Sequence, residues 1–249
     1  MKWALVTGAA QRLGRAVGLE LARAGWGVVI HYRRSAAQAQ AMAGEIVGLG
    51  GAAALVSADL DDPAARAALI DEATRAAGAR LEALVNCAAI FEHDTIETLT
   101  ETLLQRHIAT NALTPSLLAR AFAANLPPEK GGAVVNFLDF KLANPYPDHY
   151  SYTLSKYALA GATDLLARAL APRVRVNAVA PGYVLAAPGQ SEADYRRLHD
   201  DTPLKRGPTP EDIASAVRFL IENQAITGQT IYVDGGRRFQ SFDRDMGFM

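Results

Sequence analysis

Short apolar runs alternate with longer stretches of helical periodicity along the whole chain. Seven runs rich in Val, Leu, Ile and Ala are typical of buried strands: Trp3–Val6, Val28–His31, Ala52–Val56, Leu81–Val85, Ala133–Leu138, Val174–Val179 and Gln229–Val233. The helical stretches between them are Leu13–Ala24, Ala36–Val47, Pro63–Ala77, roughly Leu99–Ala124, Tyr150–Leu170 and Glu211–Glu222. Strands that alternate with helices favour a mostly parallel sheet with helices on both faces, joined by right-handed crossovers. The pattern predicts a doubly wound α/β fold of about seven strands.

Nothing in the pattern divides the chain into parts. No internal repeat or Pro/Ser-rich linker interrupts the 249 residues, a length that one α/β domain can account for. We therefore expect a single domain over residues 1–249. The least regular segment, about 186–210, carries four prolines and several charges. It is either a lid over the substrate or a plain surface connection.

Composition excludes several classes of protein. The formal net charge is -1 and the pI is about 6.5, so no general attraction to nucleic acid or anionic membranes is expected. Cys87 is the single cysteine, which excludes an intramolecular disulfide. No run approaches the roughly 18 apolar residues of a membrane span, and no signal peptide is recognised at the N-terminus. A cytoplasmic protein without a metal site is expected.

The first strand-to-helix turn is the candidate for binding a dinucleotide pyrophosphate. In a doubly wound sheet this turn holds the pyrophosphate against the helix N-terminus, and small residues let the phosphates approach the backbone. Here it reads Thr7-Gly8-Ala9-Ala10-Gln11-Arg12-Leu13-Gly14, with Arg12 where a middle glycine is usual. A tight turn with a surface arginine is the alternative. The position of the turn favours a Rossmann-type cofactor site that includes Gly8, Arg12, Leu13 and Gly14.

The end of the second strand indicates which dinucleotide is used. An NAD site usually has an acidic residue there for the ribose hydroxyls. This chain instead has Arg33, Arg34 and Ser35, with Arg12 able to approach from the first turn. Guanidinium groups match a 2′-phosphate in shape and charge, so NADPH is favoured over NADH. A solvated basic turn is the alternative.

Two further strand ends are expected to touch the cofactor. Asp59 follows the third strand and could accept a hydrogen bond from the adenine amino group, with Leu60 beside it. The segment Asn86-Cys87-Ala88-Ala89 has the small side chains needed where backbone passes close to a cofactor, with Asn86 and Ala88 as the contacts. Cys87 itself fits a small buried hydrophobe better than a nucleophile.

Tyr152 and Lys156 form the candidate chemical centre. They are four residues apart at the start of a helix, so both project from one face. They follow the fifth strand, at the edge of the sheet that faces the cofactor. A phenol is a poor acid, with a pKa near ~10, and a nearby ammonium lowers it. Tyr152 can therefore give a proton as hydride arrives, and Lys156 can also hold the nicotinamide ribose.

With these motifs the chain resembles the short-chain dehydrogenase/reductase family over nearly its whole length. The remaining motifs are Asn111, Tyr152-Thr153-Leu154-Ser155-Lys156, Asn177-Ala178-Val179-Ala180-Pro181-Gly182 and Val233-Asp234-Gly235-Gly236. The resemblance implies that Tyr152 is the acid and Lys156 its modulator, that Asn111 belongs to a water-linked proton relay, and that Pro181 and Gly182 lie along the nicotinamide. It also implies a homotetramer packed through the helices that carry Asn111 and Tyr152.

Three departures from the family pattern are informative. The family usually places a serine thirteen residues before the tyrosine, where this chain has Asp139. It has a glycine where this chain has Arg12, and Asn where this chain has Cys87. Asp139 and Arg12, with the run His31-Tyr32-Arg33-Arg34-Ser35-Ala36-Ala37, resemble the pteridine reductase branch, which includes bacterial dihydromonapterin reductases. That resemblance implies that Arg12 contacts the cofactor, that Asp139 acts with Tyr152, and that Phe91 stacks on a pterin held against the nicotinamide.

The chemistry of Asp139 supports a change of substrate class. An ionised carboxylate repels a developing alkoxide and raises the pKa of Tyr152. It suits a substrate that presents N–H groups and takes a proton on a ring nitrogen, as a dihydropterin does. The alternative is that Asp139 only orders the loop from Phe140 to His149. The side chains of Tyr146, His149 and Tyr183 are further candidates for the pocket wall, or plain packing residues.

Three hypotheses about function follow. The first is an NADPH-dependent reductase of a dihydropterin or dihydrofolate-like C=N bond, with a small pterin-like molecule as its partner. The second is a generic carbonyl or 3-oxoacyl reductase. The third is a protein that senses NADPH without catalysis. The tail 237–249, with Phe239, Phe242 and Phe248, is expected to cross to a neighbouring subunit and help close its pocket.

Overall fold

One parallel sheet forms the centre of the molecule. The computed structural model describes residues 1–186, 189–241 and 243–245. Its strands are β1 (Trp3–Val6), β2 (Gly27–Tyr32), β3 (Ala53–Ser57), β4 (Leu81–Asn86), β5 (Gly132–Phe137), β6 (Val174–Pro181) and β7 (Thr230–Val233). They form a seven-stranded sheet in the order β3-β2-β1-β4-β5-β6-β7, with parallel pairing throughout. The predicted α/β fold is confirmed.

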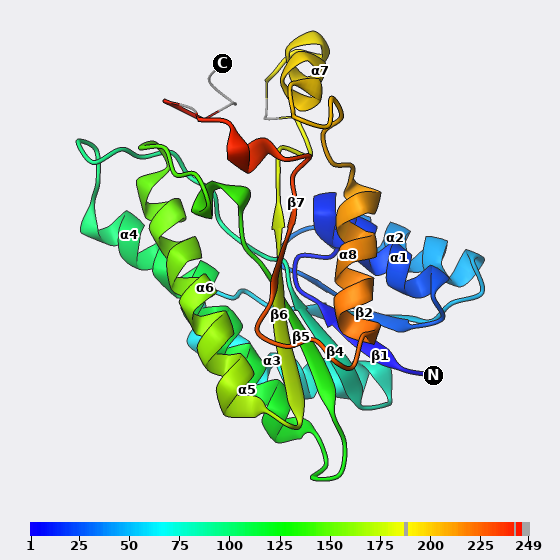
Figure 1. The fold of residues 1–249 in the computed structure, drawn as a ribbon. Coiled ribbons are helices and arrows are strands. Elements are labelled where there is room, and N and C mark those ends of the chain that lie inside the picture. Colours follow the sequence, from blue (N-terminus) through cyan, green and yellow to red (C-terminus); the bar gives the residue numbers. More distant parts are fainter. Residues whose placement is uncertain (187–188, 242, 246–249) are drawn as a thin grey trace.

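Helices cover both faces of this sheet (Figure 1). One face carries α1 (Arg12–Arg23), α2 (Ala36–Gly48) and α8 (Pro210–Glu222). The other carries α3 (Pro63–Ala77), α4 (Glu101–Ile108), α5 (Thr114–Asn125) and α6 (Tyr150–Leu170). Within the described ranges, no helix is both long and apolar enough to cross a bilayer.

The strands are apolar on both sides because both of their faces are buried. Ala4 and Val6 of β1 pack into the core beneath α1, α2 and α8, whereas Leu5 packs into the core on the opposite face. Val29 of β2 likewise points away from its neighbours Val28 and Ile30. Continuous apolar runs, without the polar alternation of a half-exposed strand, therefore were the correct signal for this sheet.

Strand order reverses direction between β1 and β4, and this places the site. Chain connections leave these two neighbours toward opposite sides, which opens a crevice beyond their carboxyl ends. The first turn follows β1 and Asn86 ends β4, so the sequence segments expected to hold the cofactor meet at this crevice.

The structure differs from the sequence prediction in two helical regions. The long helical region expected over roughly Leu99–Ala124 consists of α4 and α5 joined by a π-helical turn, Ala109–Leu113. The segment 186–210 contains an additional helix, α7 (Glu192–Asp200), above the carboxyl ends of the strands (Figure 1). Only Leu198 of α7 is buried, so its apolar periodicity is weak. The sequence does contain a signal for the start of α7, because serine is a preferred N-cap residue. In the structure the Ser191 side chain accepts a hydrogen bond from Asp194 N.

His31 links three strand ends beneath the first turn. Its Nδ1 accepts a hydrogen bond from Gly8 N (3.1 Å), and its Nε2 lies 3.1 Å from the carbonyl oxygen of Ala58. A carbonyl accepts only, so Nε2 carries the proton and the ring is neutral. Burial lowers the pKa of His31 to about 4, in agreement with this tautomer. Sequence analysis assigned no role to this residue.

We expect His31 to make the protein less stable below pH 6.5. Between pH 6.5 and about 4 the unfolded chain binds a proton that the folded chain does not, so the free energy of unfolding falls as the pH falls. The difference in pKa corresponds to about 3 kcal/mol at most. The substitution His31→Asn keeps an acceptor for Gly8 N and removes the titration.

Urea unfolding at pH 7.5 and pH 4.5 measures this effect. The wild type should lose about 2–3 kcal/mol more than His31→Asn between the two pH values. An equal loss in both proteins would contradict the role given to His31.

Candidate active site

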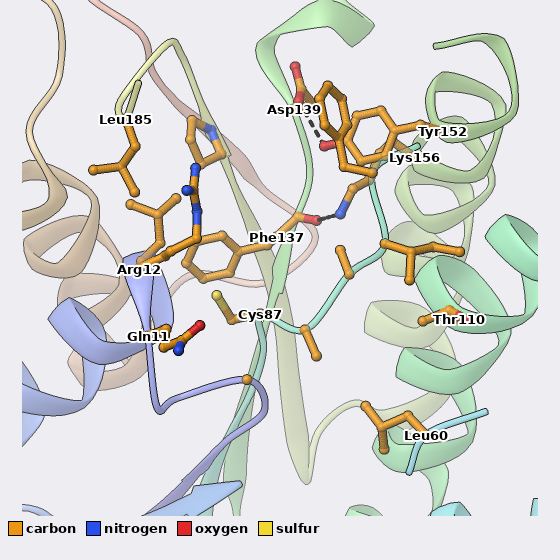
Figure 2. Close-up of a pocket in the computed structure, with 18 of the residues that line it drawn as sticks. Gln11, Arg12, Leu60, Cys87, Thr110, Phe137, Asp139, Tyr152, Lys156 and Leu185 are labelled. Carbon is orange, nitrogen blue, oxygen red and sulfur yellow. Dashed lines mark hydrogen bonds between the residues drawn. The ribbon is translucent and has the colours of Figure 1, made fainter. Parts of the chain in front are cut away.

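A cavity of about 630 Å³ opens at the carboxyl ends of the strands. Residues of the first turn, of the β2 and β3 ends, and of the segments after β4, β5 and β6 line it. In Figure 2, Arg12 and Leu185 stand across this cavity from Tyr152 and Lys156. Most residues predicted to bind cofactor line the cavity: Gly8, Arg12, Leu13, Gly14, Arg33, Arg34, Ser35, Asp59, Leu60, Ala88, Lys156, Pro181 and Gly182.

The first turn is held by very close backbone packing. Gly8 has φ +66°, in the left-handed region, and a Cβ there would lie 3.2 Å from Ala88 Cα. A Cβ on Gly14 would lie 2.9 Å from the carbonyl carbon of Gly8 and 3.0 Å from Ala9 Cα. Only glycine at these two positions lets α1 begin directly beneath the turn.

Arg12 occupies the glycine-like position in a glycine-like conformation. Its φ is +52°, which costs an arginine about 1–2 kcal/mol. The N-cap residue of α1, Gln11, makes no side-chain cap bond. A helix start of this kind, with Arg12 beside it, is suited to a phosphate group, because amide N–H groups and a guanidinium both bind anions.

The basic residues after β2 lie at the same end of the cavity. Arg33 NH1 lies 3.7 Å from Asp59 Oδ1 and 3.5 Å from Asp61 Oδ2. These two carboxylates hold Arg33 at the cavity edge, an ion pair that the sequence analysis did not foresee. Arg34 and Ser35 also line the cavity, so the chain offers hydrogen-bond donors for a 2′-phosphate there.

Asp139, Tyr152 and Lys156 meet at the opposite end of the cavity (Figure 2). Tyr152 Oη donates a hydrogen bond of 2.8 Å to Asp139 Oδ2. Lys156 Nζ donates one of 2.7 Å to the carbonyl oxygen of Phe137 and lies 5.4 Å from the centre of the Tyr152 ring. The two helix residues share one face of α6, and Asp139 follows β5, so the sheet edge brings all three together.

Burial favours the protonated forms of both Asp139 and Tyr152, and the charge of Asp139 adds to the effect on Tyr152. Removal from water raises the pKa of Asp139, although the backbone N–H of Lys141 and the Tyr152 hydroxyl both stabilise its ionised form. Burial, and then the charge of Asp139, raise the pKa of Tyr152 well above its usual value. The pKa of Tyr152 is thus raised, whereas the sequence predicted that Lys156 would lower it. Burial lowers the pKa of Lys156 to about 8.

Two predicted site residues lie behind the cavity wall. Asn86 is buried and donates a 2.9 Å hydrogen bond to Asn136 Oδ1 in the interior. Asn111, in the π-helical turn, binds both backbone groups of Ile90, accepting from N at 2.9 Å and donating to O at 3.0 Å. Neither is among the lining residues, so the structure gives each a contact that supports the wall.

Cys87 lines the cofactor end of the cavity. Burial raises the pKa of its thiol to about 12, and the nearby Lys156 charge offsets only part of this rise. The thiol therefore stays protonated near neutral pH, which agrees with a packing residue and not with a nucleophile.

Phe91 lies at the substrate end on a loop that is anchored on both sides. The ring is 53% exposed and lines the cavity. It stacks on His149, with ring centres 3.9 Å apart and planes 14° apart, and meets Tyr152 edge to face at 4.6 Å. An aromatic ring held open to a cavity in this way is available to stack on a planar ligand.

Three residues of the substrate end are new to the site, Lys141, Asp148 and Asp245, and they meet at Tyr146. Lys141 and Tyr146 line the cavity, and Lys141 Nζ lies 3.8 Å from the Tyr146 ring centre and 3.4 Å from Asp148 Oδ1. Tyr146 Oη donates to Asp245 Oδ2 (3.2 Å), and Asp245 N donates to Asp148 Oδ2 (2.6 Å). Tyr146 had been named only as a possible wall residue. Only the tertiary fold brings Asp245 to the others.

Asp245 of the tail lines the cavity of its own chain. The crossing of the tail to a neighbouring subunit stays a prediction. Phe239 is largely exposed. Phe242 and Phe248 lie outside the described residues.

Comparison with known proteins agrees with this geometry. A family model described as enoyl-(acyl carrier protein) reductase matches residues 8–238. An uncharacterized oxidoreductase of Methylorubrum extorquens is 36% identical over 248 residues, covering 95% of this chain and 98% of the relative. A 3-oxoacyl-(acyl-carrier-protein) reductase of Staphylococcus aureus is 32% identical over 240 residues, covering 94% and 97%.

Two solved structures are similar over nearly the whole chain. FolM alternative dihydrofolate reductase 1 from Brucella suis, in complex with NADP, has a TM-score of 0.91 and 40% identity, covering 96% of each chain. The Brucella canis protein of the same name, also complexed with NADP, has a TM-score of 0.92 and 39% identity, covering 98% of this chain and 96% of its own. The resemblance inferred from the motifs is confirmed: this chain belongs to the short-chain dehydrogenase/reductase family of oxidoreductases.

Proposed function

We propose that this protein is an NADPH-dependent reductase of a C=N bond in a dihydropterin or dihydrofolate-like substrate. The observation that carries the proposal is the 2.8 Å hydrogen bond between Tyr152 and Asp139 at a cavity wall that also holds Phe91. The likeness to two NADP-bound alternative dihydrofolate reductases supports it. The meeting of Asp139, Tyr152 and Lys156 disfavours a protein that only senses the cofactor.

The residues of the cavity fit NADPH. The close-packed turn at Gly8 and Gly14 and the start of α1 suit the pyrophosphate, while Arg12, Arg34 and Ser35 suit the 2′-phosphate. Lys156 would hold the nicotinamide ribose, and Pro181 and Gly182 would lie beside the nicotinamide. When bound, the cofactor supplies the hydride that adds to the carbon of the C=N bond.

The chain itself supplies the proton for the nitrogen. Tyr152 Oη holds a proton that its raised pKa keeps in place until the nitrogen gains electron density. The Tyr152 hydroxyl donates to Asp139, so it passes its proton to the nitrogen by turning away from the carboxylate or through water. After Tyr152 has given up its proton, the phenolate takes one back from an acid in solution, and Asp139, whose pKa is raised, can carry that proton to Tyr152 directly or through water. A carboxylate in this place also accepts hydrogen bonds from the N–H groups of a pterin.

Reduction of a 3-oxoacyl thioester is the second candidate. The 3-oxoacyl-(acyl-carrier-protein) reductase relative and the family description favour it. A ketone becomes an alkoxide as hydride arrives, and Asp139 would repel that charge. The carboxylate at this position therefore favours the C=N substrate.

A homotetramer stays part of the proposal. Leu154, Tyr157 and Leu165 of α6 are exposed apolar residues, and Leu113 beside α5 is exposed as well. An apolar stripe of this kind is suited to a subunit interface.

Replacement of Asp139 tests the substrate class. Asp139→Ser removes the carboxylate that accepts from Tyr152 and introduces a hydroxyl that can donate to a carbonyl oxygen. We expect kcat/KM for a dihydropterin to fall about 100-fold or more, because general acid catalysis is worth that much. The KM for NADPH should change less than threefold.

Steady-state NADPH oxidation with a dihydropterin and with an acetoacetyl thioester measures this prediction. Asp139→Asn keeps the size of the side chain and serves as the matched variant. Unchanged dihydropterin turnover in both variants would remove Asp139 from the mechanism. Faster thioester reduction than dihydropterin reduction by the wild type would favour the second candidate.

Cofactor choice should depend on Arg34. Arg34→Gln removes one charge-assisted contact to a 2′-phosphate, so the KM for NADPH should rise roughly 10–100-fold while that for NADH stays nearly constant. Arg15→Gln is the control, because Arg15 pairs with Glu45 away from this cavity. Equal effects on both cofactors would exclude a 2′-phosphate contact.

The pH dependence of kcat/KM should follow the ionisation of Lys156. Its ammonium is present below about pH 8 and is lost as the pH rises above that value. If the charge is needed, kcat/KM should fall about tenfold per pH unit above this pKa. Lys156→Arg keeps its charge throughout, so its lower activity should show no such decline between pH 8 and 10. A flat wild-type profile would contradict this assignment.

A further inference from the structure

His149 lies directly behind the Phe91 ring, which lines the substrate end of the cavity. Its imidazole is almost fully buried and stacks on Phe91 at 3.9 Å, nearly parallel, yet His149 does not line the cavity. Phe91 does line it and is about half exposed. The imidazole therefore backs one side of the Phe91 ring from within the protein.

The backbone at His149 is held in a costly conformation. This residue has φ +50° and ψ +47°, in the left-handed region, and its side chain makes no cap bond to α6. An L-residue there costs about 1–2 kcal/mol. Instead of capping, the ring turns back, and its Nδ1 lies 3.0 Å from the carbonyl oxygen of Glu92, the residue after Phe91.

A different residue caps α6, so the His149 ring can serve the Phe91 loop instead. The buried carboxylate of Asp94 accepts from Ser151 N at 3.0 and 3.2 Å, and the Ser151 hydroxyl also donates to it. On the other side of Phe91, Asn111 binds both backbone groups of Ile90. The loop is fixed before and after Phe91, and the ring itself is fixed by His149.

We propose that His149 is a positioning residue, which holds the plane of Phe91 so that a flat bicyclic substrate can stack on it. The inference rests on the proposed function, because a pterin-like ring is the substrate that such a platform serves. It predicts a loss of substrate affinity, without a matching loss of NADPH affinity, when the imidazole is removed.

His149→Asn tests the inference, because asparagine tolerates the left-handed conformation and lacks a ring. The KM for the dihydropterin should rise roughly three- to tenfold, the range of an aromatic contact, with the KM for NADPH and the Tm little changed. His149→Phe keeps a ring to stack and should recover part of the loss. His93→Asn is the matched control, since His93 is exposed and meets His149 edge to face, at 5.1 Å.

A double-mutant cycle separates positioning from general destabilisation. If His149 acts through Phe91, adding His149→Asn to Phe91→Leu should change the dihydropterin KM by less than twofold. An unchanged or lower KM in His149→Asn, or a full effect in the Phe91→Leu background, would overturn the inference and leave the proposed function standing. A wild-type protein that neither reduces nor binds a dihydropterin would overturn both.

Discussion

A half-buried carboxylate facing a buried phenol is the constraint on which this site depends. The two groups share a hydrogen bond of 2.8 Å. Removal from water raises the pKa of Asp139, and burial together with the charge of Asp139 raises the pKa of Tyr152. The family pattern has a neutral serine in place of Asp139, and the exchange changes what the cavity can bind. It turns a donor for carbonyl oxygen into an acceptor for N–H groups, while Tyr152 keeps its proton for a basic nitrogen.

The fold keeps this pair in place with contacts that lie outside the cavity. Lys156 is anchored to the Phe137 carbonyl at the end of β5, two residues before Asp139, so helix and strand are tied next to the reacting groups. Asn111 and Asp94 fix the loop after β4 to the π-helical turn and to α6. Lys141, Asp148 and Tyr146 connect the loop after Asp139 with Asp245 of the tail. The substrate end is thus assembled from four separate parts of the chain.

Two of the three non-glycine residues with positive φ in the described part of the chain lie at the two ends of the cavity, and the third is Lys205. Arg12 at the cofactor end and His149 at the substrate end are both non-glycine residues with positive φ. Left-handed conformations of such residues persist where surrounding contacts fix them. At Arg12 the strain places a guanidinium beside the start of α1. At His149 it directs the ring onto Phe91 instead of along the helix axis.

The sequence alone determined the fold class, the family and most residues of the cavity wall. Apolar runs report strands buried on both faces, and the glycine-poor turn, Tyr152, Lys156 and Asp139 have fixed places relative to those strands. Sequence could not determine the balance of pKa shifts on Tyr152, because burial is a property of the packed molecule. The stacking of His149 on Phe91 and the arrival of Asp245 at the cavity join residues 58 and about 100 positions apart. Contacts between residues so far apart leave no local periodicity or capping pattern in the sequence, so only the tertiary structure decided them.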